Sequence, residues 1–194
     1  MANESLSAYH LSSNPGNTYE PGRGNFFELI VDGLGDLLRA GVDRNLAEES
    51  DFIDNAQEVV RLTVSQVNVP HFDQDVITIR RGNSVSKYAG APTFNEGSLI
   101  VDDLIGADSK SVLEAWQRLS YDVTTDKGGR AINYKKNATL IEYTADWKQV
   151  RYWELIGCWI SGLSEDAYNK ESTGDLRKVS ATIQYDRAIP HMPD

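Results

Sequence analysis

Residues 133–165 read NYKKNATLIEYTADWKQVRYWELIGCWISGLSE, and after a polar spacer residues 174–188 read GDLRKVSATIQYDRA. Three runs of alternating apolar and polar residues occur in this region, with turn-like spacers between them. A period of two is the mark of a half-buried strand. The three runs therefore predict strands at about 135–144, 149–157 and 176–186. In the last run one face is apolar and the other polar: Val179, Ala181, Ile183 and Tyr185 against Lys178, Ser180, Thr182, Gln184 and Asp186.

The rest of the chain carries further strand signals. Gly, Pro and Asn punctuate them, as is typical of turns. The expected strands lie at 25–32, 59–69, 75–80, 85–88 and 98–104. Many short strands with little helix predict a mainly β fold, an antiparallel small β-barrel or two-sheet sandwich.

One flanking α-helix is expected at about 109–121. Val112, Trp116 and Leu119 recur at helical spacing, so one face is apolar. Asp108 or Ser109 is a candidate N-cap, and Ser-x-x-Glu from residue 111 is similar to a capping box. We expect Trp116 to anchor this helix on the sheet.

Length and composition favour one globular domain with its own core. The chain has 194 residues, of which 40% are hydrophobic and 25% charged. Residues 1–24, rich in Ser, Asn, Gly and Pro, are expected to form an extended arm, either flexible or ordered by a neighbouring subunit. The β domain spans 25–188 and includes an acidic insertion at 43–58, where a short surface helix is possible. Residues 189–194 are expected to be a C-terminal tail.

The formal net charge of -10 argues against a surface that binds nucleic acid, which needs a basic patch. No apolar run approaches the ~20 residues of a membrane-spanning helix. The start, MANESLSAYH, lacks the features of a signal peptide. We therefore expect a chain that is made in the cytoplasm and is not inserted into a membrane.

Catalytic and metal-binding patterns do not emerge. His10, His71 and His191 are far apart and never at ligand spacing. The single cysteine, Cys158, lies in an apolar run, which predicts a buried, inert thiol. Ser84-x-x-Lys87 falls in a strand, whereas the functional motif needs a helix turn. No catalytic, cofactor-binding or metal-binding residue is therefore assigned, and we expect neither an enzyme nor a bound cofactor.

The charged residues instead suggest contacts between subunits. A basic patch on one copy can meet an acidic patch on the next, and an exposed basic edge is the alternative reading. The candidate contacts are Arg80, Arg81, Lys87, Asp102, Asp103, Glu48 and Glu49.

Taken in order along the chain, several segments resemble the tail tube proteins of contractile-tailed bacteriophages, a family related to type VI secretion tube proteins. The resemblance covers 23–42 and 59–188. The arm 1–24 and the acidic segment 43–58 depart from the family pattern. The matching segments are RGNFFELIVD (23–32), SVSKYAGAPTF (84–94), SLIVDD (98–103), LEAW (113–116), YKK (134–136), WELIGCW (153–159) and VSATIQYDR (179–187).

The resemblance implies a structural subunit that forms hexameric rings. Stacked rings make a hollow tail tube inside a contractile sheath, and the tube carries DNA through the host envelope without binding it specifically. The implied partners are further copies of the chain, the sheath, the baseplate hub and the tail terminator. The implied location is the virion tail, assembled in the host cytoplasm.

Two alternatives remain open at this point. One is the inner tube of a bacterial type VI-like secretion system or of an extracellular contractile injection system, in which the cargo is protein. The other is a small-molecule-binding β-barrel or an enzyme, which would need a pocket with converging polar groups. The sequence nominates no such pocket.

Overall fold

The computed structural model describes residues 24–42, 53–104, 108–165 and 176–192. The strands within these ranges are β1 (Phe27–Val31), β2 (Val64–Val67), β3 (Phe72–Arg81), β4 (Ser84–Phe94), β5 (Gly97–Asp102), β6 (Tyr121–Asp122), β7 (Lys127–Gly128), β8 (Lys136–Tyr143), β9 (Gln149–Glu165), β10 (Lys178–Gln184) and β11 (Arg187–His191). The helices are α2 (Leu34–Val42), α3 (Ala56–Thr63), α4 (Ser109–Arg118) and α5 (Ala131–Tyr134).

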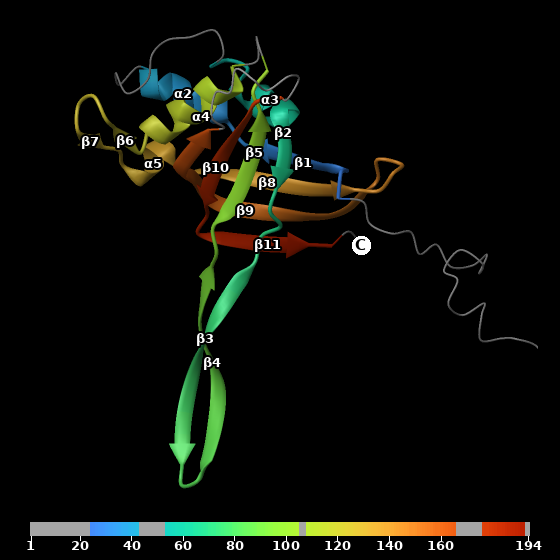
Figure 1. Ribbon diagram of the computed structural model, residues 1–194, viewed down its shortest axis with the longest axis vertical. Coiled ribbons are helices and arrows are strands. Elements are labelled where there is room, and N and C mark those ends of the chain that lie inside the picture. The colour runs from blue at the N-terminus through green and yellow to red at the C-terminus, as the bar shows by residue number, and fades with distance from the viewer. Residues whose placement is uncertain (1–23, 43–52, 105–107, 166–175, 193–194) are drawn as a thin grey trace, which may run out of the picture.

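Strand β9 is the central strand of the main sheet and pairs with three other strands (Figure 1). On one side it pairs with β8, which pairs with β1. On its other side the first half pairs with β11 and the second half with β10. Strands β5 and β2 continue from β10, which gives the order β1-β8-β9-β10-β5-β2 with every pairing antiparallel. One long strand thus belongs to two smaller sheets.

The bend between these two halves lies at Gly157. Its φ is +72°, a region that residues with a Cβ rarely adopt. A Cβ built on Gly157 would lie 2.4 Å from Oδ2 of Asp186. The Asp186 N–H donates to the carbonyl of Ile156 at 2.9 Å, and Lys135 Nζ donates to the Asp186 carboxylate at 2.7 and 2.8 Å. Glycine is therefore the residue that this corner can accept.

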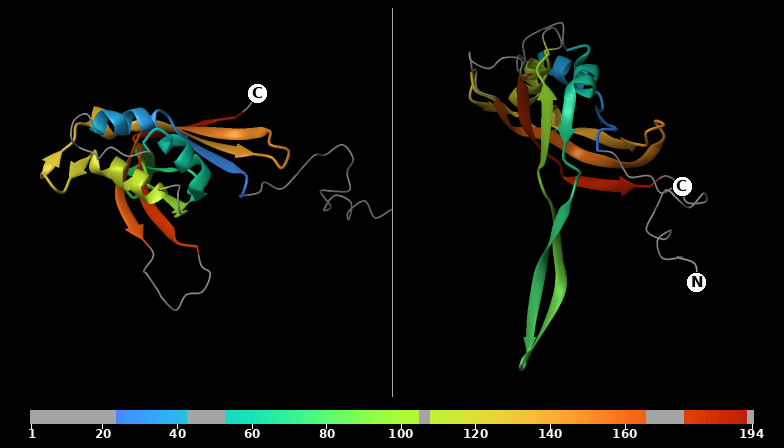
Figure 2. Two further views of the ribbon diagram at one scale, coloured as in Figure 1. Left: turned by 90° about the horizontal axis from the view of Figure 1, so that it is seen from above. Right: turned by 45° about the vertical axis from the view of Figure 1, so that its right-hand side comes forward.

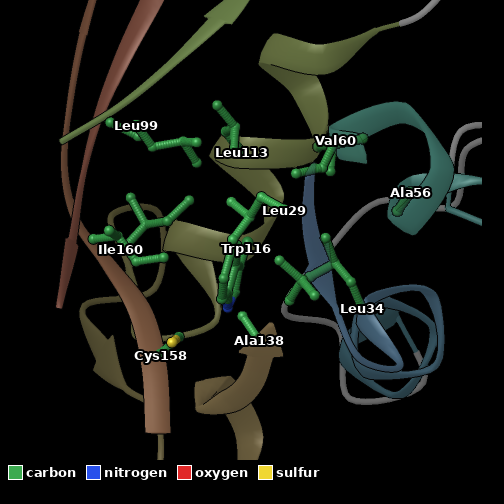
Figure 3. Close-up of a cluster of buried hydrophobic side chains, with 14 of the residues drawn as sticks. Leu29, Leu34, Ala56, Val60, Leu99, Leu113, Trp116, Ala138, Cys158 and Ile160 are labelled. Carbon is green, nitrogen blue, oxygen red and sulfur yellow. The ribbon is translucent and has the colours of Figure 1, made fainter. Parts of the chain in front are cut away.

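The hydrophobic core lies between the curved sheet and the helices α2, α3 and α4 (Figures 1 and 3). Trp116 of α4 is 1% exposed, and its indole N–H donates to the carbonyl of Tyr134 at 2.8 Å. That bond satisfies the only polar group of the indole, so the ring can be buried without cost. Leu113 and Val60 surround it from α4 and α3 (Figure 3).

Helices α2 and α3 bury faces with helical spacing. Leu34, Leu37, Leu38 and Gly41 face the core from α2. In α3 the corresponding residues are Ala56, Val60 and Thr63. Burial at i, i+3 and i+4 is the pattern of an amphipathic helix packed on a sheet.

The main fold prediction is confirmed: the chain is mainly β, its sheets are antiparallel, and a helix carrying Trp116 packs at their side. The predicted apolar face of β10 is buried from Val179 to Tyr185. The turn at Gly82 also joins two strands as expected. The sheet is not a closed barrel, however, because β1 and β2 form its two ends without pairing.

Other predictions are wrong. The strand expected at 59–69 is helix α3 followed by the short strand β2, and helices α2 and α3 join the single expected helix. Asp108 makes no side-chain capping hydrogen bond. Strand β9 runs on to Glu165, past the expected end at 157, and the predicted tail at 189–194 begins inside β11. The arm 1–24, apart from Gly24, and residues 43–52 of the acidic insertion lie outside the described residues.

Replacing Gly157 by Ala is expected to lower the free energy of unfolding by about 2 kcal/mol or more, because the new Cβ is strained at this φ and collides with Asp186. Chemical denaturation measures the change. Gly128→Ala is the matched control, since a Cβ there meets nothing within 4 Å. Equal stability of the two variants would contradict the proposed role of the bend.

Candidate assembly surfaces

Strands β3 and β4 form a two-stranded ribbon that projects from the body (Figures 1 and 2). All ten residues of β3 are exposed. The ribbon is about 30 Å long at ~3.3 Å per residue. An isolated hairpin is only marginally stable in water, so a ribbon of this length is expected to gain stability from a partner.

The cross-strand register gives the ribbon two different faces. Directly opposed residues share a face. One face carries the pairs Ile77–Tyr88 and Ile79–Ser86, so three of these four side chains are apolar. The exposed fractions of Ile77 and Tyr88 are both 52%. Apolar side chains held this far into solvent indicate a surface that is covered in an assembly.

The predicted basic residues lie near the tip of this ribbon. Arg80 pairs with Val85, and Lys87 pairs with Thr78, so these two cations share the second face. Arg81 pairs with Ser84 and lies on the face of Ile79. The three residues that were grouped by sequence are therefore divided between the two faces. Both faces combine cationic and apolar side chains.

A bulge near the root sets the path of the ribbon. The register shifts between Gln74 and Val76, where the single residue Asp75 of β3 lies opposite two residues of β4, Gly90 and Ala91. A Cβ on Gly90 would lie 2.8 Å from the Asp75 carbonyl oxygen, so the two backbones approach as only glycine allows. Phe72 and Phe94 close the root with ring centroids 5.6 Å apart.

The predicted acidic residues lie at the other end of the molecule. Strand β5 starts near the ribbon and runs away from it to Asp102 (Figure 1). Asp103 forms an ion pair with Arg177 at 3.1 Å. Within the described residues, the buried Oδ1 of Asp102 has no hydrogen-bond partner. Glu48 and Glu49 lie outside the described residues.

The outward face of β2, β5, β10 and the second half of β9 is polar and carries mostly hydroxyl and amide groups. Gln184 Nε2 donates to Glu96 at 2.7 Å and to Ser161 Oγ at 3.3 Å. Glu96 precedes β5 and Asp102 ends it, so these two acids stand at the ends of the face. The neutral polar residues of the face are Ser65, Gln66, Ser98, Ser161, Ser164, Ser180, Thr182 and Gln184.

The sites that the sequence did not nominate are the apolar residues of the ribbon. Val76, Ile77 and Ile79 resemble ordinary core residues of a strand. Two features of the sequence could have identified the ribbon as an exposed surface. Apolar residues occur on both faces of the hairpin, and a single chain cannot bury both faces of a hairpin at its surface. In addition, no helix that could cover the hairpin lies next to the tight turn at Gly82 in the sequence.

Metal-binding, membrane-spanning and nucleophilic features are scarce among the described residues. No group of three His, Cys, Asp or Glu side chains among them could hold a metal ion. No described helix is long and apolar enough to cross a membrane. Cys158 is buried as predicted, and burial raises the pKa of its thiol to about 12. The run from Ser84 to Lys87 lies in β4 and not in a helix turn.

No family model matches the sequence, and no curated protein matches it. Solved structures do. A chain of the sheath–tube complex of an extracellular contractile injection system (PVC, extended state) matches with a TM-score of 0.61 and 13% identity over 100% of both chains. The fold is that of contractile injection system components.

Two further structures support this likeness. A chain from the sheath/tube terminator of the PVC system has a TM-score of 0.61 at 16% identity, over 90% of this chain and 99% of that one. A chain from the tube-terminating cap of the anti-feeding prophage has a TM-score of 0.60 at 12% identity, over 90% and 93%. At these identities the likeness concerns the fold.

The Cys158 thiol is expected to react with a disulfide reagent at about pH 8 at least about 100-fold more slowly in the folded chain than in denaturant, because the thiolate is the reactive form. Because burial raises the pKa of the folded thiol, the thiol of the unfolded chain ionises at a lower pH than that of the folded chain. The free energy of unfolding should therefore fall as the pH rises above about 9. Absorbance of the released thiol measures the rate, and this chain has one cysteine. Rapid native labelling would contradict the burial.

Proposed function

We propose that this chain is the subunit of a self-assembling tube in a contractile, tail-like injection machine. The observation that carries the proposal is the exposed apolar ribbon on a body with this fold. A solitary protein would leave Ile77, Ile79 and Tyr88 in water. A chain that lays its ribbon on further copies removes these side chains from water and completes the hairpin.

The two ends of the molecule carry different charges. The ribbon tip carries Arg80, Arg81 and Lys87, whereas the far end of β5 carries Asp102 and Asp103, of which Asp103 is already paired with Arg177. A tip that meets the acidic end of the next copy makes a heterologous contact, which propagates instead of closing within a pair. This arrangement supports stacked rings, with hexameric rings expected from the sequence resemblance.

The hydroxyl-rich face is the best candidate for the wall of the bore. A passing cargo needs a surface that stays hydrated and does not hold it, and neutral hydroxyl and amide groups provide one. The buried side of the same strands faces the core, so alternate residues serve the two roles. Ser180, Thr182 and Gln184 are the central residues of the proposed wall.

The sequence resemblance favours the tail tube of a contractile-tailed phage. The expected cargo is then DNA, the location is the virion tail, and the partners are the sheath, the baseplate hub and the tail terminator. The second candidate is the inner tube of an extracellular contractile injection system, which the solved structures favour. We expect no catalytic activity in either case. Neighbouring genes, for a capsid and terminase or for effectors and a loading ATPase, distinguish the two.

Electron microscopy of the purified chain tests the shared proposal. At high concentration we expect rings and stacked tubes with a central channel. A chain that stays monomeric at all concentrations and salt conditions would overturn the proposal.

Reversing two ribbon charges, Arg80→Glu with Lys87→Glu, is expected to reduce tube formation at least about tenfold while the melting temperature changes little. Both side chains are exposed, and exposed substitutions rarely change stability by more than about 0.5 kcal/mol. Sedimentation measures assembly. The control, Lys127→Glu with Arg130→Glu, makes the same change in net charge away from the ribbon. Equal loss in both variants would mean that net charge alone acts.

A further inference from the structure

The turn between β8 and β9 places a tryptophan where glycine is usual. Trp147 has φ +58°, in the left-handed region. The Trp147 N–H donates to Thr144 at 3.0 Å, and the Thr144 N–H donates to Lys148 at 2.8 Å. This is a short hairpin loop whose last position is left-handed, a position that favours Gly or Asn. A bulky side chain there is a backbone outlier.

The other described residues with positive φ are different. Apart from glycines, only Asp108 and Asp126 share the left-handed region within the described ranges, and Asp tolerates it. Trp147 contacts Phe26 and Tyr143 with ring centroids 5.7 Å apart in both cases. Even so, the Trp147 side chain is 67% exposed. Packing within the chain thus leaves most of the indole in water, at a position where it is strained.

A cavity suited to such a ring lies elsewhere on the same chain. It has a volume of about 290 Å³ and opens between the root of the ribbon and β11. The turn that carries Trp147 lies at the end of the β8–β9 hairpin, away from this root (Figures 1 and 2). The lining is mostly apolar: Pro70, His71, Phe72, Phe94, Trp153, Ala188 and Pro190.

We propose that Trp147 of one copy inserts into this cavity of a second copy. The inference rests on the proposed self-assembly. The cavity adjoins the ribbon, so it is continuous with the proposed interface. Asp146 and Lys148 flank the indole, and the exposed His71 lines the cavity, so the proposed insertion brings Asp146 of one copy towards an imidazole of the other. A knob and a hole on different parts of one chain form a heterologous contact, which extends from copy to copy. The strained left-handed backbone at Trp147 is then explained by its role, since it holds the indole where a second copy can bind it.

Trp147→Gly separates this role from a structural one. Glycine suits the left-handed turn, so the melting temperature is expected to stay the same or rise, while tube formation falls at least tenfold. Ala145→Gly in the same loop is the control and should assemble as wild type. A fall of several degrees in the melting temperature would show that the indole serves the chain's own packing, and would overturn the proposal. So would normal tubes from Trp147→Gly.

A mixing experiment tests the pairing itself. Ala188→Phe fills the cavity but keeps the indole, whereas Trp147→Gly keeps the cavity. Each variant by itself should associate weakly. Their 1:1 mixture should form pairs in analytical ultracentrifugation, because one complete knob and one complete hole remain. A mixture that associates no more than either variant overturns the proposal. Wild-type chains that form no tubes would instead overturn the proposed function.

Discussion

The bend of β9 at Gly157 is the constraint on which the rest of the structure depends. An antiparallel strand of 17 residues cannot serve two differently oriented sheets unless its path turns sharply. The positive φ of Gly157 makes the turn, and the Asp186 carboxylate occupies the space that a side chain would need. Lys135 neutralises that carboxylate at 2.7 Å, and Asn137 Oδ1 accepts the Gly157 N–H at 3.2 Å. The corner is therefore held by Asp186 between β10 and β11, by Lys135 just before β8 and by Asn137 within β8.

The bend decides which surfaces remain for assembly. Because the sheet curves, its concave side can close over Trp116 and the helices, and its other side stays free. Strands β2 and β5 then lead out of the body towards the ribbon, which projects away from it (Figure 2). One element thus supplies the core and leaves both the polar face and the apolar ribbon for neighbours. The core is thus closed within one chain, whereas, among the described strands, the ribbon is left exposed and the two ends of the sheet are left unpaired.

The sequence predicted the parts of the fold in which one pattern had one physical reading. Strand β10 alternates because one face is core, and Trp116 sits on an apolar helical stripe. At 59–69, however, Val60, Leu62 and Val64 fit a period of two, whereas the structure buries Ala56, Val60 and Thr63 at helical spacing and leaves Leu62 72% exposed. Short apolar runs are ambiguous in this way. The ribbon could not be recognised because the strand signals at 75–80 and 85–88 do not tell whether their apolar residues are buried within the chain or exposed.

Charge and shape together give the chain a direction. A net charge of -10 makes bodies repel one another at low salt, which disfavours random association. The ribbon tip is the local exception, and it stands at the end opposite to the acidic terminus of β5. The proposed head-to-tail contact therefore joins two copies that point the same way, whereas two ribbon tips, both cationic, repel each other. A dimer joined by such a head-to-tail contact still has one unpaired contact surface at each end, so a further copy can bind there in the same way. Screening by salt should weaken the repulsion between bodies and the attraction at the tip alike. In the proposed tube, the apolar ribbon, which salt does not screen, is then the part of the interface that holds the copies together.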